Sequence, residues 1–185
     1  MEMRRVVVTG LGAVTPLGNT VSETWESMKA GKNGIGPITA FSTEGLKATL
    51  AAEVKNFDPA DYMTVNEALR TDRYAQFAVA AAQQAVTESG IVGTVDPERF
   101  SVIFGTGIGG IHTFEVEHQK LMEKGPRRVS PLFVPMMIAN MAAGLIAIRY
   151  DCRGSAMPAK YNKLMVKTII TLGRFIELVI LYSQL

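Results

Sequence analysis

The sequence predicts an α/β fold, because short β-rich runs alternate with helical segments along the chain. The first β-rich run spans residues 5–9 and the second spans residues 100–104, and each is followed by a glycine-rich turn. Between them, residues 72–89 show the clearest helical pattern. Strands that alternate with helices favour a mostly parallel sheet covered by those helices.

The composition fits a soluble globular protein. The 185 residues are 48% hydrophobic and 19% charged, with a mean hydropathy of +0.17. This length suits one domain, and the apolar content argues against disorder. A net charge of +2 is too balanced for a nucleic-acid partner. The apolar run near the N-terminus is too short for a signal peptide, and no uncharged apolar stretch is long enough to span a membrane. We therefore expect a cytoplasmic protein with neither a nucleic-acid nor a membrane partner.

Capping residues and periodicity predict four helices. Thr20 and Glu23 fit a capping box for a helix that ends at Gly31. The helix over residues 72–89 would bury one face and end at Gly90; that face comprises Tyr74, Phe77, Ala78, Ala81 and Ala85. A third helix runs from about residue 111 to residue 124, and a single, fully buried helix is expected over residues 135–148.

The glycines between the second strand and the third helix allow two interpretations. Gly105, Gly107 and Gly110 match the G-x-G-x-x-G spacing of a dinucleotide-binding loop. The acidic residue that should hold the ribose about 20 positions later has no counterpart, because residues 123–128 read as a helix end and a turn. Close packing at a turn is the favoured interpretation, and a nucleotide-binding domain is kept as a distant alternative.

Other reactive side chains form no convincing site. His112 and His118 lie six residues apart on the expected helix, so they do not share a face as a metal pair would. We expect them at the surface, and we expect no bound metal. Cys152 is the only thiol, which excludes internal disulfides. Arg127 and Arg128 could meet an acidic partner, although adjacent arginines are usually solvated.

Read together, eight motifs occur in order over residues 3–150: Arg4–Gly12, Thr15–Asn19, Trp25, Gly31–Ile35, Gly105–Gly110, Gly125–Arg128, Ser130–Pro135 and Asn140–Gly144. This series resembles the N-terminal part of the β-ketoacyl-[acyl carrier protein] synthases, closest to type II. The resemblance implies a partial thiolase-like fold, the incomplete first half of an α-β-α-β-α layered architecture. It displaces the dinucleotide interpretation of the glycine loop.

The resemblance also implies an activity. Members of the family are homodimeric acyltransferases of fatty acid biosynthesis. They condense malonyl-acyl carrier protein with an enzyme-bound acyl chain and release carbon dioxide, and no cofactor is implied. The expected partner is acyl carrier protein with acyl or malonyl cargo.

The family's catalytic residues cannot be placed in this chain. They are a cysteine in a T-A-C-x-S-G motif at a helix N-terminus, two later histidines and a later lysine. Cys152 stands too early and lacks the flanking motif, and His112 and His118 are not the equivalent histidines. We therefore assign no catalytic residue and expect the chain to be inactive alone. The alternative is a non-catalytic fragment that dimerises or binds acyl carrier protein.

Part of the acyl pocket can be carried over by resemblance. Gly107 and Ile108 resemble the loop that moves when an acyl chain enters. Phe133 resembles the residue that reaches the neighbouring subunit's pocket at the dimer interface. An apolar wall suits this role, because each buried methylene contributes about 0.8 kcal/mol to binding.

The C-terminal part of the sequence has a different character. From residue 164 to residue 185, 14 of 22 residues are apolar, and they follow neither the helical nor the strand period. We divide the chain into a ketoacyl synthase N-terminal region, residues 1–150, and a divergent apolar tail, residues 151–185. A frameshift or a gene break near Asp151 is our hypothesis for that change.

Overall fold

A computed structural model describes residues 7–159 and 177–183. Its α-helices are α1 (Val21–Lys29), α2 (Val65–Ala68), α3 (Arg73–Ser89), α4 (Ile111–Lys124), α5 (Phe133–Met137) and α6 (Met141–Arg149). Short 3-10 turns are η1 (Pro59–Asp61), η2 (Pro97–Arg99) and η3 (Pro126–Arg128). The strands are β1 (Val7–Val14), β2 (Gly36–Pro37), β3 (Leu50–Ala51), β4 (Val102–Gly105), β5 (Ala156–Ala159) and β6 (Glu177–Ser183). The alternation of strands and helices confirms the α/β class.

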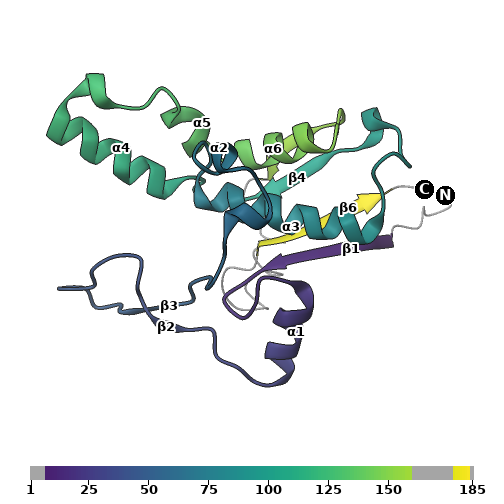
Figure 1. Cartoon of the computed structure of the whole chain (residues 1–185), viewed down its shortest axis with the longest axis horizontal. Helices are drawn as coiled ribbons and strands as arrows, with labels where there is room; N and C mark the ends of the chain where they lie inside the picture. Colours follow the sequence, from purple (N-terminus) through teal and green to yellow (C-terminus); the bar gives the residue numbers. More distant parts are fainter. Residues whose placement is uncertain (1–6, 160–176, 184–185) are drawn as a thin grey trace.

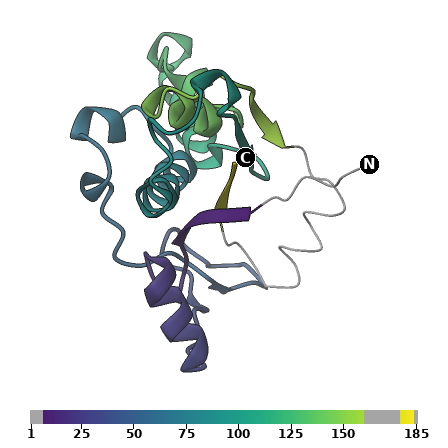
Figure 2. The ribbon, with the colours of Figure 1, turned by 90° about the vertical axis from the view of Figure 1, so that its right-hand side faces the viewer.

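Within residues 7–159 and 177–183 the strands pair in three two-stranded ladders. β1 pairs with β6 and β2 pairs with β3, both antiparallel, whereas β4 and β5 are parallel. The expected mostly parallel sheet is therefore wrong for the described residues, in which β4–β5 is the parallel ladder. α3 lies along β1 and β6, while α1 and the β2–β3 arm lie on the other side of β1 from α4, α5 and α6 (Figures 1 and 2).

Two glycines let β1 pack directly against α3. The sequence predicts that this strand ends at Thr9, but β1 continues through Gly10 and Gly12 to Val14. A Cβ atom at Gly12 would overlap the backbone carbonyl of Ala81, and one at Gly10 would overlap the carbonyl of Ala85. These glycines are thus sites of close strand–helix contact rather than the start of a loop.

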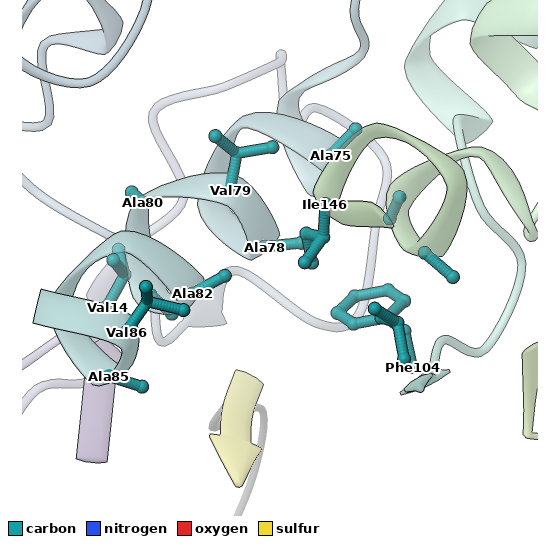
Figure 3. Packing of buried hydrophobic residues seen from close by; sticks show 14 of the residues in the cluster. Val14, Ala75, Ala78, Val79, Ala80, Ala82, Ala85, Val86, Phe104 and Ile146 are labelled. Carbon is teal, nitrogen blue, oxygen red and sulfur yellow. The ribbon is translucent and has the colours of Figure 1, made fainter. Parts of the chain in front are cut away.

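The core forms around the alanine-rich helix α3. Ala78, Ala81 and Ala85 are fully buried, as the sequence predicts, and so are Ala80 and Ala82 on other sides of the helix. Figure 3 shows that α6 and β4 cover part of this helix, with Ile146 and Phe104 beside it. Because alanine side chains are short, the neighbouring backbones approach α3 closely and the core needs few large residues.

The helix caps largely follow the sequence. Thr20 accepts a hydrogen bond from the backbone N–H of Glu23 at 3.2 Å, but the Glu23 carboxylate accepts from Asn19 N–H at 2.8 Å rather than from the N-cap residue itself. The expected capping box is therefore displaced by one residue. Asp72 is the N-cap of α3, and Gly90 ends it in the left-handed conformation with φ of +60°.

The single helix expected over residues 135–148 is wrong. The segment forms α5 and α6, separated by an extended Ile138 with ψ of 140°. The carbonyl oxygens of Met137 and Ile138 accept hydrogen bonds from Gly110 N–H at 2.9 Å and from the Tyr74 hydroxyl at 2.6 Å. Contacts with other elements thus replace the next helical turn. The segment is not fully buried either, because Ile148 is 80% exposed.

Most of the predicted divergent tail, residues 160–176 and 184–185, lies outside the described residues. The remainder of the tail contains β5 and β6. None of the helices in the described ranges is long and apolar enough to cross a membrane.

Candidate functional site

The loop between β4 and α4 is firmly packed at its second half. Gly109 has φ of +86°, and a Cβ atom there would overlap the Met137 carbonyl. The N–H of Gly110 donates to that same carbonyl at 2.9 Å, and the N–H of Gly109 donates to the Thr106 hydroxyl at 3.2 Å. These contacts support the close-packing interpretation. A Gly110 amide that is already bonded is also not available to a pyrophosphate.

The first half of the loop is open. Gly107 is exposed and Ile108 has 66% of its surface exposed. The exposed side chain of Ile108 therefore stands next to an anchored turn.

Phe133 lies on a second element beside the same helix. It is the first residue of α5, it is half-buried, and its ring centroid lies 6.0 Å from that of Phe114 on α4. Phe114 in turn stacks on His118, with centroids 6.2 Å apart and rings 4° from parallel. Phe114 is not among the predicted site residues, although its i, i+4 spacing to His118 is a local signal in the sequence.

The histidines lie at the surface, as the sequence predicts. His112 and His118 are both exposed on α4. Among the described residues, no group of three or more histidine, cysteine or carboxylate side chains is arranged to hold a metal ion.

A band of exposed apolar side chains follows the loop, α4 and α5. We call it the apolar band; its members are Ile108, Ile111, Phe114, Leu121, Met122, Leu132 and Val134. If these side chains form one contiguous apolar surface, it would suit a binding or interaction site.

Nothing in the described part of the chain activates Cys152 as a nucleophile. It follows the C-terminal end of α6 and its N–H donates to the Ala147 carbonyl at 2.9 Å, so no helix N-terminus favours the thiolate. The side chain is 8% exposed. Burial, followed by the negative charge of Asp151, raises the pKa of Cys152 to about 11.

Arg127 and Arg128 are exposed on η3, in a turn held by a buried acid. The Glu117 carboxylate accepts from Ser130 N–H and from the Lys120 ammonium, each at 2.6 Å. These two donors, the lysine first, hold the pKa of Glu117 below its usual value. The acid therefore fixes where the two arginines are presented.

A polar cleft of about 680 Å³ lies away from the apolar band. It is formed by residues 15–19, the first turns of α1, Lys32 and residues 55–56. The motif Thr15–Asn19 forms one wall of the cleft, but the sequence does not predict the cleft, because the other walls come from residues distant in sequence. None of the predicted pocket residues lines it.

Comparison with known proteins places these features in one family. Residues 3–160 match the family profile described as Beta-ketoacyl synthase, N-terminal domain. The 3-oxoacyl-[acyl-carrier-protein] synthase 2 of Synechocystis sp. is 46% identical over 155 residues, which are 83% of this chain and 37% of that protein. The protein of the same name from Staphylococcus aureus strain COL is 47% identical over 154 residues, again 83% of this chain and 37% of the relative. The chain thus spans about 37% of the length of these curated relatives.

Solved structures agree in fold. The ishigamide ketosynthase/chain length factor superposes with a TM-score of 0.75 at 31% identity, covering 86% of this chain and 40% of that one. A type II polyketide ketosynthase in complex with its acyl-carrier protein gives a TM-score of 0.66 at 22% identity, covering 87% of this chain and 42% of that one. The neighbours are ketosynthases, so the described α/β structure is a partial thiolase-like fold.

Proposed function

This chain belongs to the β-ketoacyl synthase family, and we propose that it forms part of the acyl-binding wall of a 3-oxoacyl-[acyl carrier protein] synthase. The observation that supports this best is the loop between β4 and α4. Its end is anchored at Gly109 and Gly110, while Ile108 is exposed just before that anchor, and α4, the helix that follows, carries Phe114 next to Phe133 of α5.

The reaction of the complete synthase defines what this wall would do. A cysteine thioester of the enzyme carries the acyl chain, malonyl-acyl carrier protein loses carbon dioxide, and the resulting carbanion displaces the thiol to give 3-oxoacyl-acyl carrier protein. The acyl chain needs an apolar, water-free channel throughout. Gly107 and Ile108 would form its movable wall, and Phe133 would reach from α5 into the pocket of the neighbouring subunit.

We propose that the 185-residue chain does not catalyse this reaction by itself. The nucleophile must be a thiolate, and a pKa of about 11 leaves roughly one Cys152 in a thousand ionised at pH 8. No oxyanion-binding helix N-terminus begins at this residue. Acyl carrier protein as the partner and the cytoplasm as the location follow from the proposed reaction.

A condensation assay tests the proposal. The purified chain is mixed with acyl-acyl carrier protein and malonyl-acyl carrier protein, and carbon dioxide release and 3-oxoacyl product are measured. We expect no turnover above the protein-free rate, for both the wild type and Cys152→Ala. Turnover that Cys152→Ala abolishes would show that Cys152 is a nucleophile and would refute the proposal.

A second candidate is a non-catalytic fragment that dimerises or binds acyl carrier protein. The apolar band and the exposed arginines of η3 favour it, since the former suits a second copy and the latter an acidic surface. Titration with holo-acyl carrier protein distinguishes carrier binding, because Arg127→Ala/Arg128→Ala should weaken it by about tenfold or more at low salt. Equal binding by the wild type and the double variant would exclude this surface.

A further inference from the structure

One buried carboxylate caps two helices. Asp72 is 6% exposed and is the N-cap of α3, where its Oδ1 accepts from Tyr74 N–H at 3.4 Å. Its Oδ2 accepts from the N–H of Thr113 at 2.9 Å and from the Thr113 hydroxyl at 2.6 Å. Thr113 lies in the first turn of α4, 41 positions away in the sequence.

Helix α4 has no capping side chain of its own. Its N-cap is Gly110, which makes no side-chain hydrogen bond. A Cβ atom at Gly110 would lie 2.9 Å from Asp72 Oδ2 and 2.5 Å from the Met136 carbonyl oxygen. The glycine therefore leaves room for the carboxylate, and Asp72 satisfies the buried amide of Thr113 in the first turn of α4, which would otherwise lack an acceptor.

The same turn of α3 also holds the break between α5 and α6. The Tyr74 hydroxyl donates to the Ile138 carbonyl at 2.6 Å, and Gly110 N–H donates to the neighbouring Met137 carbonyl at 2.9 Å. The start of α3, the start of α4 and the break between α5 and α6 are thus held together by hydrogen bonds near Gly110. Ile108, two residues earlier, is outside this junction and exposed.

We propose that Asp72 is the positioning residue of the glycine loop. It fixes Gly109–Thr113 in place, so that any movement of the loop is confined to residues 105–108. This inference rests on the proposed function for its consequence, because the fixed point would set where Ile108 stands against an acyl chain. The anchoring itself does not depend on an acyl ligand.

Aspartate is better suited to this position than asparagine. Both N–H and O–H of Thr113 are directed at Oδ2, and Tyr74 N–H is directed at Oδ1, so an acceptor is required at both oxygens. Asparagine has a single side-chain oxygen, so Asp72→Asn can accept from Tyr74 N–H or from the Thr113 donors, but not from both, and it also loses the negative charge. Thr113→Val leaves Asp72 on Tyr74 N–H and therefore tests the anchoring of α4 apart from the capping of α3.

Hydrogen–deuterium exchange of the full chain tests the proposal. In Asp72→Asn we expect the amides of residues 110–114 to exchange about tenfold faster, with unchanged exchange in the α3 interior, residues 78–88. Thr113→Val, which removes the hydroxyl donor but keeps the N–H, should give a smaller increase in the same segment. Asp96→Asn is the matched control, because Asp96 caps only η2 by accepting from Glu98 N–H at 3.0 Å.

The outcomes are distinct. Unchanged exchange at residues 110–114 in both Asp72→Asn and Thr113→Val would overturn the proposal. Equal acceleration through α3 would also overturn it, because Asp72 would then act as an ordinary cap of its own helix. If Asp72→Asn does not fold, Thr113→Val decides alone.

A separate arm tests the proposed function. Adding a long-chain acyl-pantetheine to the wild type should slow exchange at residues 105–108 if this loop contacts acyl chains. No slowing, together with a positive result for Asp72→Asn, would leave the anchor in place and count against the acyl-binding role.

Discussion

At the scale of single residues, glycines decide how closely elements approach. Gly12 in β1 has the carbonyl of Ala81 where a Cβ atom would lie, whereas Gly144 in α6 has nothing within 4 Å of that position. The same substitution should therefore have opposite effects at these two positions.

Gly12→Ala should destabilise the fold by about 3 kcal/mol or more, because β1 and α3 must separate to admit the methyl group. Gly144→Ala should stabilise it by about 0.5–1 kcal/mol, because it improves helix propensity without a clash. Urea unfolding followed by circular dichroism measures both. Equal effects would contradict the close strand–helix contact.

Cys152 should be an unreactive thiol. With a pKa of about 11, its alkylation by iodoacetamide at pH 8 should be roughly 200-fold slower than that of an exposed cysteine near pKa 8.5. Asp151→Asn should lower the pKa of Cys152, because it removes the negative charge that adds to the effect of burial. A fitted pKa below about 9 in the wild-type chain would contradict this description.

The raised pKa of Cys152 also determines how the stability of the fold depends on pH. The pKa of Cys152 is raised in the folded chain, so the neutral thiol is favoured by folding. The stabilisation that comes from keeping this thiol neutral is fully present below the unfolded pKa of about 9. It is lost as the pH rises toward the folded pKa of about 11.

At the scale of elements, Glu117 links α4 to the turn that carries Arg127 and Arg128. Glu117→Gln should raise amide exchange at Ser130 by about tenfold, because a charged acceptor of that N–H becomes neutral. Glu115→Gln, on the exposed part of the same helix, is the control and should leave Ser130 unchanged.

The pH dependence follows from the lowered pKa of Glu117. A carboxyl whose folded pKa is depressed stabilises the fold above its unfolded pKa, and this contribution is lost as the pH falls below about 4.5 through the folded pKa. Protection at Ser130 should therefore decrease on acidification in the wild type. It should stay constant over that range in Glu117→Gln, and a parallel decrease in both would exclude Glu117 as the cause.

The elements show where sequence reasoning succeeds and where it stops. The helix over residues 73–89 was predictable because its cap, its periodic face and its final glycine are all local signals. The break at Ile138 was not, because it depends on hydrogen bonds from Tyr74 and Gly110, which are distant in sequence. The extension of β1 through two glycines likewise depends on α3.

At the candidate site, too, the sequence identifies some residues and not others. Gly107, Ile108 and Phe133 came from a family resemblance, and their role in an acyl pocket stays a prediction. The surface position of His112 and His118 is confirmed. The sequence marks residue 72 only as the start of the helix over residues 72–89, because the second partner of Asp72, Thr113, is 41 residues away.

At the scale of the whole molecule, the apolar band is one of the exposed apolar surfaces of the described residues. Met122 on α4 is 72% exposed, and Leu46, which lies outside the band, is 52% exposed. If the band is an interface between copies, Met122→Ser should raise the dissociation constant about tenfold, since burying such a side chain contributes about 1–2 kcal/mol. Sedimentation over a range of concentrations measures this, with Leu46→Ser as the control. Equal weakening by both variants would indicate unspecific association.

The central claim is that residues 1–150 supply a functional part of a ketoacyl synthase. The most direct measurement replaces the matching segment of the 47% identical Staphylococcus aureus relative with residues 1–150 of this chain and assays condensation. We predict a folded chimera whose kcat/KM lies within about tenfold of that relative, and a further loss when Ile108 is changed to Asp. A chimera that folds with normal thermal stability yet forms no 3-oxoacyl product would contradict the claim.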